Sequence, residues 1–159
     1  MKAASVKQLK DELKYRSQED LLELCLRLSK FKKENKELLS YLLFDVDNES
    51  GYIADIKLEI DEQFELINKK TYYFIKKSVR KILRNIKKYI RYSKQKETEV
   101  ELLLYFCNKL KDMSPSMKDN PTLHNIFKKQ VEITKKNILL LHEDLQYDFG
   151  EEIKELTDY

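Results

Sequence analysis

The chain has 159 residues, of which 42% are hydrophobic and 37% charged, and its formal net charge is +3. Only two glycines and two prolines occur, so the many tight turns of a β-rich protein are excluded. No run of 18 apolar residues occurs and the start lacks the apolar core of a signal peptide, so we expect a cytoplasmic protein without membrane insertion. Because Lys, Leu and Glu favour helices, we predict a single all-α domain over residues 1–159.

Capping signals mark several helix starts along the chain. They are Ser5 with Gln8, Ser17 with Asp20, Thr98 with Glu101, and Asn120 before Pro121. Apolar residues spaced three and four apart then predict about seven helices, near residues 6–13, 18–31, 36–44, 51–68, 71–93, 99–113 and 121–147. Gly150 is expected to separate the last helix from a short acidic tail, 149–159, for which we expect fraying.

An internal repeat is indicated when the chain is aligned with itself at an offset of 64 residues. Residues 27–43 then match residues 91–107 at eight of 17 positions. The match predicts a repeated helix pair, 18–44 and 82–108, and so a short α-solenoid-like (HEAT-like) stack of antiparallel helical hairpins. Helices rich in Lys, Leu and Glu also match one another by chance, so an irregular helical bundle is the alternative.

Charge is strongly segregated along the sequence. Residues 45–68 carry a net charge of −7, whereas residues 69–96 carry +12 and contain no acid. On a helical projection of residues 71–93, the apolar side chains from Ile75 to Ile90 fall in one arc and the cations fall in the opposite arc. The cations and one tyrosine beside them form the candidate binding face: Lys76, Lys77, Arg80, Lys81, Arg84, Lys87, Lys88, Arg91, Lys94 and Tyr73.

Three interpretations of this face are open. In the first, the protein is a non-enzymatic interaction or scaffold module whose cationic face binds an acidic protein partner or a second copy of the chain. In the second, the face binds nucleic acid, with cations on phosphates and Tyr73 available for stacking. In the third, the face is solvated and has no function. The apolar arc is needed for the core, so membrane insertion is not expected, and no small-molecule site can be identified.

The sequence holds no recognisable catalytic or metal-binding pattern. His124 and His142 stand 18 residues apart on one predicted helix, too far to share a metal ion, and we interpret both as edge residues of the core. Cys25 and Cys107 lie on apolar stripes and are expected to be reduced core residues. The acids of the predicted acidic helix are interpreted as a solvated face: Asp55, Glu59, Asp61, Glu62 and Glu65. We therefore predict no enzyme activity, no cofactor and no metal.

One stretch of the chain resembles a known group of proteins. It covers residues 19–44, EDLLELCLRLSKFKKENKELLSYLLF. This stretch is similar to an uncharacterised all-helical bacterial protein family. The resemblance implies an all-helical fold and carries over no site residue.

Overall fold

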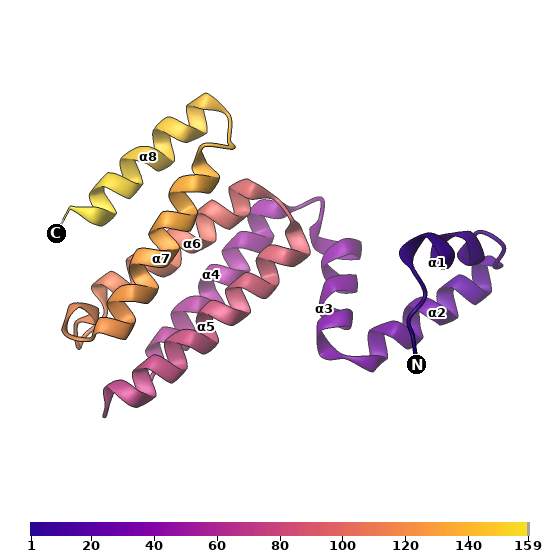
Figure 1. The fold of residues 1–159 in the computed structure, drawn as a ribbon, viewed down its shortest axis with the longest axis horizontal. Coiled ribbons are helices and arrows are strands. Elements are labelled where there is room, and N and C mark those ends of the chain that lie inside the picture. The colour runs from indigo at the N-terminus through magenta and orange to yellow at the C-terminus, as the bar shows by residue number, and fades with distance from the viewer. Residues whose placement is uncertain (159) are drawn as a thin grey trace. The chain divides into compact units, whose positions relative to one another are not determined.

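A computed structural model describes residues 1–158, which form eight α-helices and no strand (Figure 1). The helices are α1 (Val6–Leu13), α2 (Gln18–Phe31), α3 (Lys33–Ser40), α4 (Glu49–Glu65), α5 (Tyr72–Ser93), α6 (Lys96–Asp112), α7 (Pro121–Ile138) and α8 (Glu143–Thr157). A π-helical turn, η1 (Tyr41–Asp45), follows α3, and a short 3₁₀ helix, η2 (Met117–Asp119), precedes α7. The all-α prediction is confirmed.

The described chain divides into two compact units between residues 44 and 45. Unit 1 is Met1–Phe44 and contains α1, α2 and α3, whereas unit 2 begins at Asp45 and contains α4 to α8. The composition and length of the chain favour one domain and give no sign of this boundary. The boundary falls inside η1 and not in a stretch rich in Gly or Pro, so composition alone does not mark it.

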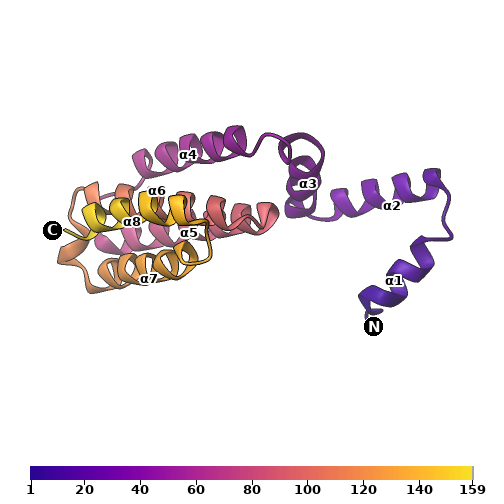
Figure 2. The same ribbon diagram turned by 90° about the horizontal axis from the view of Figure 1, so that it is seen from above.

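Unit 2 is built around α6, which contacts α4, α5, α7 and α8 (Figures 1 and 2). A helix that packs against several neighbours needs a wider apolar side than a helix at the surface. The apolar side of α6 is wide and buried: Val100, Leu102, Leu103, Leu104, Phe106, Cys107 and Leu110. Helix α6 is therefore the central helix of the core. The predicted solenoid-like stack of hairpins stays a prediction.

Helix α5 presents one apolar side to this core. Its buried aliphatic residues recur every three or four positions: Ile75, Val79, Ile82, Ile86 and Ile90. The Thr71 hydroxyl caps the start of the helix by accepting a hydrogen bond from the N–H of Phe74 (3.5 Å). Lys94 ends the helix in the left-handed conformation, with a φ of 60°. The helix predicted at 71–93 is thus present, with its apolar side inward.

Three of the predicted helix starts are confirmed, because Ser5, Ser17 and Asn120 each cap a helix. The start predicted at Thr98 is wrong. Helix α6 begins at Lys96, three residues before the predicted start at residue 99, and Thr98 is buried. The Thr98 hydroxyl donates a hydrogen bond to Oε1 of Glu49 on α4 (2.6 Å). A sequence pattern typical of a helix cap therefore serves a tertiary contact at this position.

The helix predicted at 121–147 is wrong in extent, because a break separates α7 from α8. The side-chain amide of Gln146 donates a hydrogen bond to the carbonyl of Leu141 (2.7 Å). Nδ1 of His142 accepts one from the N–H of Asp144 (3.4 Å). The last carbonyls and the first N–H groups of a helix have no hydrogen-bond partner within the helix. The two side chains provide partners for such groups at the end of α7 and the start of α8. Side-chain capping therefore stabilises the break, and neither Gln nor His is a strong sequence signal for one.

The acidic tail predicted at 149–159 also differs from the expectation. Gly150 lies inside α8, which continues to Thr157, and a Cβ atom added at Gly150 would have no neighbour within 4 Å. The buried side of α8 is formed by Phe149, Ile153 and Leu156. The tail is therefore a packed helix up to Thr157, because an apolar stripe runs between its acids. Tyr159 lies outside the described residues.

Unit 1 contains the first copy of the predicted repeat, 18–44, whereas unit 2 contains the second copy, 82–108. Equivalent positions of the two copies differ in burial, since Leu22 is exposed and Ile86 is buried. The repeat stays a prediction. Helix α3 begins at Lys33, three residues earlier than expected.

Candidate interaction surface

The cations of α5 lie on the side of the helix opposite its buried stripe. Lys77, Arg80, Arg84 and Arg91 follow one another at intervals of three, four and seven residues and therefore occupy nearly one line along the helix. Tyr73 continues this line by one turn and is 66% exposed. Of the ten residues predicted from the sequence, the exposed ones are Tyr73, Lys77, Arg80, Lys81, Arg84, Arg91 and Lys94, and the half-buried ones are Lys76, Lys87 and Lys88.

The exposed cations of the α5 helix are not neutralised by neighbouring acids. Within residues 1–158, none of Lys77, Arg80, Lys81, Arg84 and Arg91 forms an ion pair. Lys94 is exposed as well, but it caps the helix and does not lie on its helical face. We call the first five cations, with Tyr73, the cationic α5 surface.

Lys88 lies at the edge of this surface nearest α4. Its Nζ is 4.9 Å from the centre of the Tyr89 ring, a favourable cation–π distance. The Tyr89 hydroxyl in turn donates to both carboxylate oxygens of Glu59 on α4, at 2.9 and 3.0 Å. Lys88 is therefore engaged within the fold and is a weaker candidate for binding a partner than the exposed cations.

Lys129 of α7 adds a cation that the sequence analysis missed. Burial lowers the pKa of Lys87, the positive charge of Lys129 lowers it further, and the charge of Glu99 opposes both. Lys87 and Arg91 of α5 line one pocket with Ile133 of α7, which stands four residues after Lys129, so the positive region extends from α5 towards α7. Lys129 stands 42 positions after Lys87 in the sequence, and no local pattern links the two.

A shallow pocket of about 220 Å³ lies at this edge, between α5, α6 and α7. Its lining residues are Lys87, Ile90, Arg91, Glu99, Leu103 and Ile133. Three of these side chains are aliphatic, two carry a positive charge and one, Glu99, carries a negative charge, so the lining has a net positive charge. The pocket can therefore accept an apolar side chain from a partner whose neighbouring residues are acidic.

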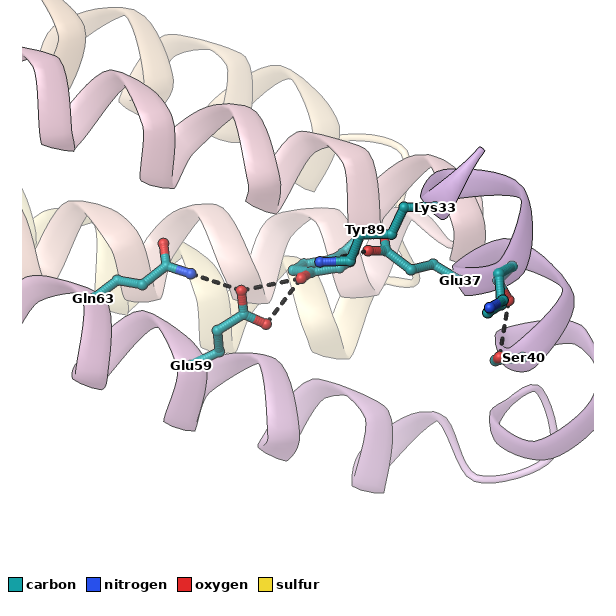
Figure 3. Close-up of polar contacts among 7 residues, drawn as sticks. Lys33, Glu37, Ser40, Glu59, Gln63 and Tyr89 are labelled. Carbon is teal, nitrogen blue, oxygen red and sulfur yellow. Dashed lines mark hydrogen bonds and ion pairs between the residues drawn. The ribbon is translucent and has the colours of Figure 1, made fainter. Parts of the chain in front are cut away.

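Two acids of α4 accept hydrogen bonds from neutral side chains. Glu59 accepts hydrogen bonds from Tyr89 of α5 and, at 2.6 Å, from the side-chain amide of Gln63 (Figure 3). Glu49 accepts from the hydroxyls of Ser93 and Thr98. These carboxylates therefore bind neutral side chains at the helix interface.

Asp61 of α4 contacts both a hydroxyl group and a cation. Both of its oxygens accept from the Tyr105 hydroxyl at 2.8 Å, and Nζ of Lys109 lies 2.9 Å away. Burial pushes the pKa of Asp61 upward, but the hydrogen bonds from Lys109 and Tyr105 and the charge of Lys109 outweigh it, so the pKa is lowered. Burial and the nearby Asp61 carboxylate together raise the pKa of Tyr105 to about 12.

The prediction of a wholly solvated acidic face is therefore wrong for Glu59 and Asp61, which are half-buried and hydrogen-bonded. It holds for Asp55, Glu62 and Glu65, which are exposed. The hydroxyl partners come from helices distant in sequence, so the spacing of the acids alone could not reveal them.

We expect the Asp61 cluster to stabilise the fold above the ordinary carboxyl pKa of 3.8 and to lose this contribution as the pH falls through the lowered native value. The native state keeps the carboxylate charged where the unfolded chain already binds a proton, so acid favours unfolding. Asp61→Asn should lower the free energy of unfolding by about 1 kcal/mol at neutral pH. The same substitution should also reduce the decrease in the free energy of unfolding as the pH falls.

Urea unfolding at neutral and acidic pH measures both effects. Asp55→Asn is the matched control, because Asp55 is an exposed acid on the same helix. An acid dependence in Asp61→Asn as steep as that of the unchanged chain would contradict the assignment.

The residues considered for catalysis do not come together. His124 is half-buried on α7, whereas His142 is exposed at the start of α8, so only His124 fits the predicted core edge. Cys107 is buried, which raises the pKa of its thiol to about 12, but Cys25 is exposed and its predicted core position is wrong. Among residues 1–158, no group of three or more His, Cys, Asp or Glu side chains is placed to hold a metal ion.

The length and apolar character needed to span a membrane are not combined in any helix of the described chain. The expected cytoplasmic location stays a prediction. Comparison with protein-family models, with curated proteins and with solved structures finds no match to this chain. The resemblance of residues 19–44 to a bacterial helical family therefore also stays a prediction.

Proposed function

We propose that the protein is a non-enzymatic interaction module and that its cationic α5 surface binds an acidic segment of a partner protein. The observation that carries this proposal is the absence of ion pairs, within residues 1–158, for the five cations of the surface. The acids of α4 nearest to α5 are occupied by hydroxyl groups. A carboxylate of the partner can therefore bind these cations without displacing a carboxylate of the protein itself.

The shape of the surface favours a narrow partner. From Lys77 to Arg91 the line of cations is about 21 Å long at the usual helical rise, and it is a single helix wide. Exposed acids such as Asp55 and Glu62 lie on the neighbouring helix α4 and repel a broad polyanion. An acidic helix or extended segment that carries one apolar side chain for the pocket beside Lys87 matches these features.

Nucleic-acid binding is the second candidate, and the aromatic pair at the start of α5 favours it. Tyr73 and Phe74 are both exposed, and their rings meet edge to face with centroids 5.5 Å apart. Exposed aromatic rings next to cations can stack on the bases of a single strand. The same cations would then contact phosphates.

Fluorescence anisotropy with two labelled probes separates the candidates. The probes are a poly-glutamate peptide of about 20 residues and an oligothymidylate of about 20 nucleotides, each titrated with the full chain. The proposal expects the peptide to bind more tightly than the oligonucleotide and its affinity to fall as salt is raised. Tighter binding of the oligonucleotide would replace the first candidate by the second. No binding of either probe at low salt would contradict both.

A further inference from the structure

Unit 1 exposes the apolar sides of its helices. Helices α1, α2 and α3 bury no apolar residue, and Ser29 is their only buried side chain within the described chain. Fourteen large apolar side chains between Val6 and Phe44 are exposed, among them Leu28 at 62% and Phe31 at 77%. Helices this short are marginal in water, and a unit of this size cannot build a sufficient core alone. A further surface must therefore cover unit 1.

A preformed groove lies between α2 and α3, which contact each other. The side-chain amide of Asn35 donates to the carbonyl of Leu28 (2.8 Å) and ties the start of α3 to the end of α2. The groove has a volume of about 260 Å³, and its apolar wall is formed by Cys25, Leu28, Leu38, Leu39 and Leu42. The two helices thus present a continuous apolar surface.

The charges along α2 indicate what covers this surface. The first half of the helix carries Glu19, Asp20 and Glu23, whereas the second half carries Arg27 and Lys30. When two copies of α2 pair in antiparallel orientation, the acidic half of each lies along the basic half of the other. The two helix dipoles then point in opposite directions, which is also favourable. Parallel pairing would place like charges side by side. The charges of two α2 helices are therefore complementary in the antiparallel orientation.

The exposed apolar area is sufficient for a stable dimer. At roughly 80 Å² per side chain, the ten of the fourteen residues that lie between Leu21 and Phe44, on the α2–α3 pair and the turn after it, expose on the order of 800 Å². A standard interface buries about 800 Å² on each partner. A monomeric protein seldom exposes an apolar area of this size.

We propose that unit 1 is a dimerisation arm, in which the α2–α3 pair of one chain packs antiparallel against the same pair of a second copy to form a four-helix bundle. The two-fold arrangement buries both grooves at once and pairs the oppositely charged halves of α2. It uses none of the cations of the α5 surface and is independent of the proposed function.

Sedimentation equilibrium of the full chain under reducing conditions tests the dimer. The unchanged chain should have twice the mass of one chain at micromolar concentration, and Leu28→Glu with Leu42→Glu should raise the dimer dissociation constant by at least about 100-fold. A chain that stays monomeric overturns the proposal, whether its leucines are then covered by the same chain or by a different protein.

A charge-swapped pair of variants guards against simple misfolding of the leucine variant. Glu19→Lys, Asp20→Lys and Glu23→Lys together make α2 wholly basic, and Arg27→Glu with Lys30→Glu makes it wholly acidic. Each variant alone should be at least about tenfold weaker as a dimer, and an equal mixture should recover the unchanged affinity as a heterodimer. Failure of the mixture to recover would overturn the pairing.

The antiparallel orientation has its own test, because Cys25 lies at the middle of α2. Antiparallel pairing brings the two copies of Cys25 together, and mild oxidation should link them. A cysteine at the end of the helix, Gln18→Cys in a Cys25→Ala chain, would lie about 20 Å from its copy and should not be linked. Cys107 is buried and does not interfere. If the Gln18→Cys variant forms the disulfide-linked dimer as readily as the unchanged chain does, the antiparallel arrangement is overturned.

Discussion

Changing Lys77, Arg80 and Arg84 together to glutamate is expected to abolish binding of an acidic peptide. In water, two unit charges in contact attract by about 1 kcal/mol, and each reversal replaces this attraction by an equal repulsion. After screening by salt, the three reversals should raise the dissociation constant by at least about 100-fold. Anisotropy with the poly-glutamate probe at low salt measures the change. The fold should be unaffected, because the three side chains are exposed.

A matched control separates the α5 surface from net charge alone. Lys2→Glu, Lys7→Glu and Lys10→Glu together change the net charge by the same amount, and all three lysines are exposed at the start of the chain. This variant should bind the peptide within about threefold of the unchanged chain. A loss of affinity as large as that of the α5 variant would show that the overall charge carries the attraction.

Phe106→Ala is expected to cause the largest loss of stability among single core substitutions. Phe106 is 0% exposed at the centre of α6, and its ring lies 6.0 Å from that of Phe64 on α4. Removing a buried aromatic ring loses its transfer free energy and leaves a cavity, which together cost about 3–5 kcal/mol. Since small domains are stable by roughly 5–15 kcal/mol, the variant should unfold at a much lower urea concentration.

The control for this substitution is Leu66→Ala. Leu66 lies in the same unit, just after α4, and is 83% exposed, so its truncation should change stability by less than about 0.5 kcal/mol. Urea unfolding followed by circular dichroism compares the two variants. A loss below about 1 kcal/mol for Phe106→Ala would contradict the central position of α6 in the core.

Helix α5 could be predicted from the sequence because its signals are local and agree. Isoleucine and valine recur at helical spacing, Thr71 provides the cap, and no acid interrupts the cations. These features decide which side of the helix faces the core, and hence that the cations face away from it. The same holds for the helix starts at Ser5, Ser17 and Asn120, where the cap and its helix are adjacent in the chain.

Features that depend on tertiary contacts could not be predicted. The hydroxyl that occupies Glu59 comes from Tyr89, 30 residues later, and the charge felt by Lys87 comes from Lys129. The break before α8 depends on Gln146 reaching back to backbone carbonyls. In each case the partner is identified only when distant segments are placed side by side.

Unit 1 shows a different limit of sequence reasoning. The apolar spacing of α2 correctly predicts an amphipathic helix, but it does not say what covers the apolar side. We expected a core within one domain, whereas Leu28 and its neighbours are exposed. The apolar spacing predicts which side of a helix is buried, but it does not predict which segment or molecule packs against that side.

Heteronuclear NMR of the full chain, titrated with the poly-glutamate peptide, locates the bound partner residue by residue. If the cationic α5 surface is the binding site, amide shifts should change along α5 from Tyr73 to Arg91 and near Lys129, and the far ends of α1 and α8 should be unaffected. Shifts confined to other helices, or spread evenly over every lysine of the chain, would contradict the proposed binding site.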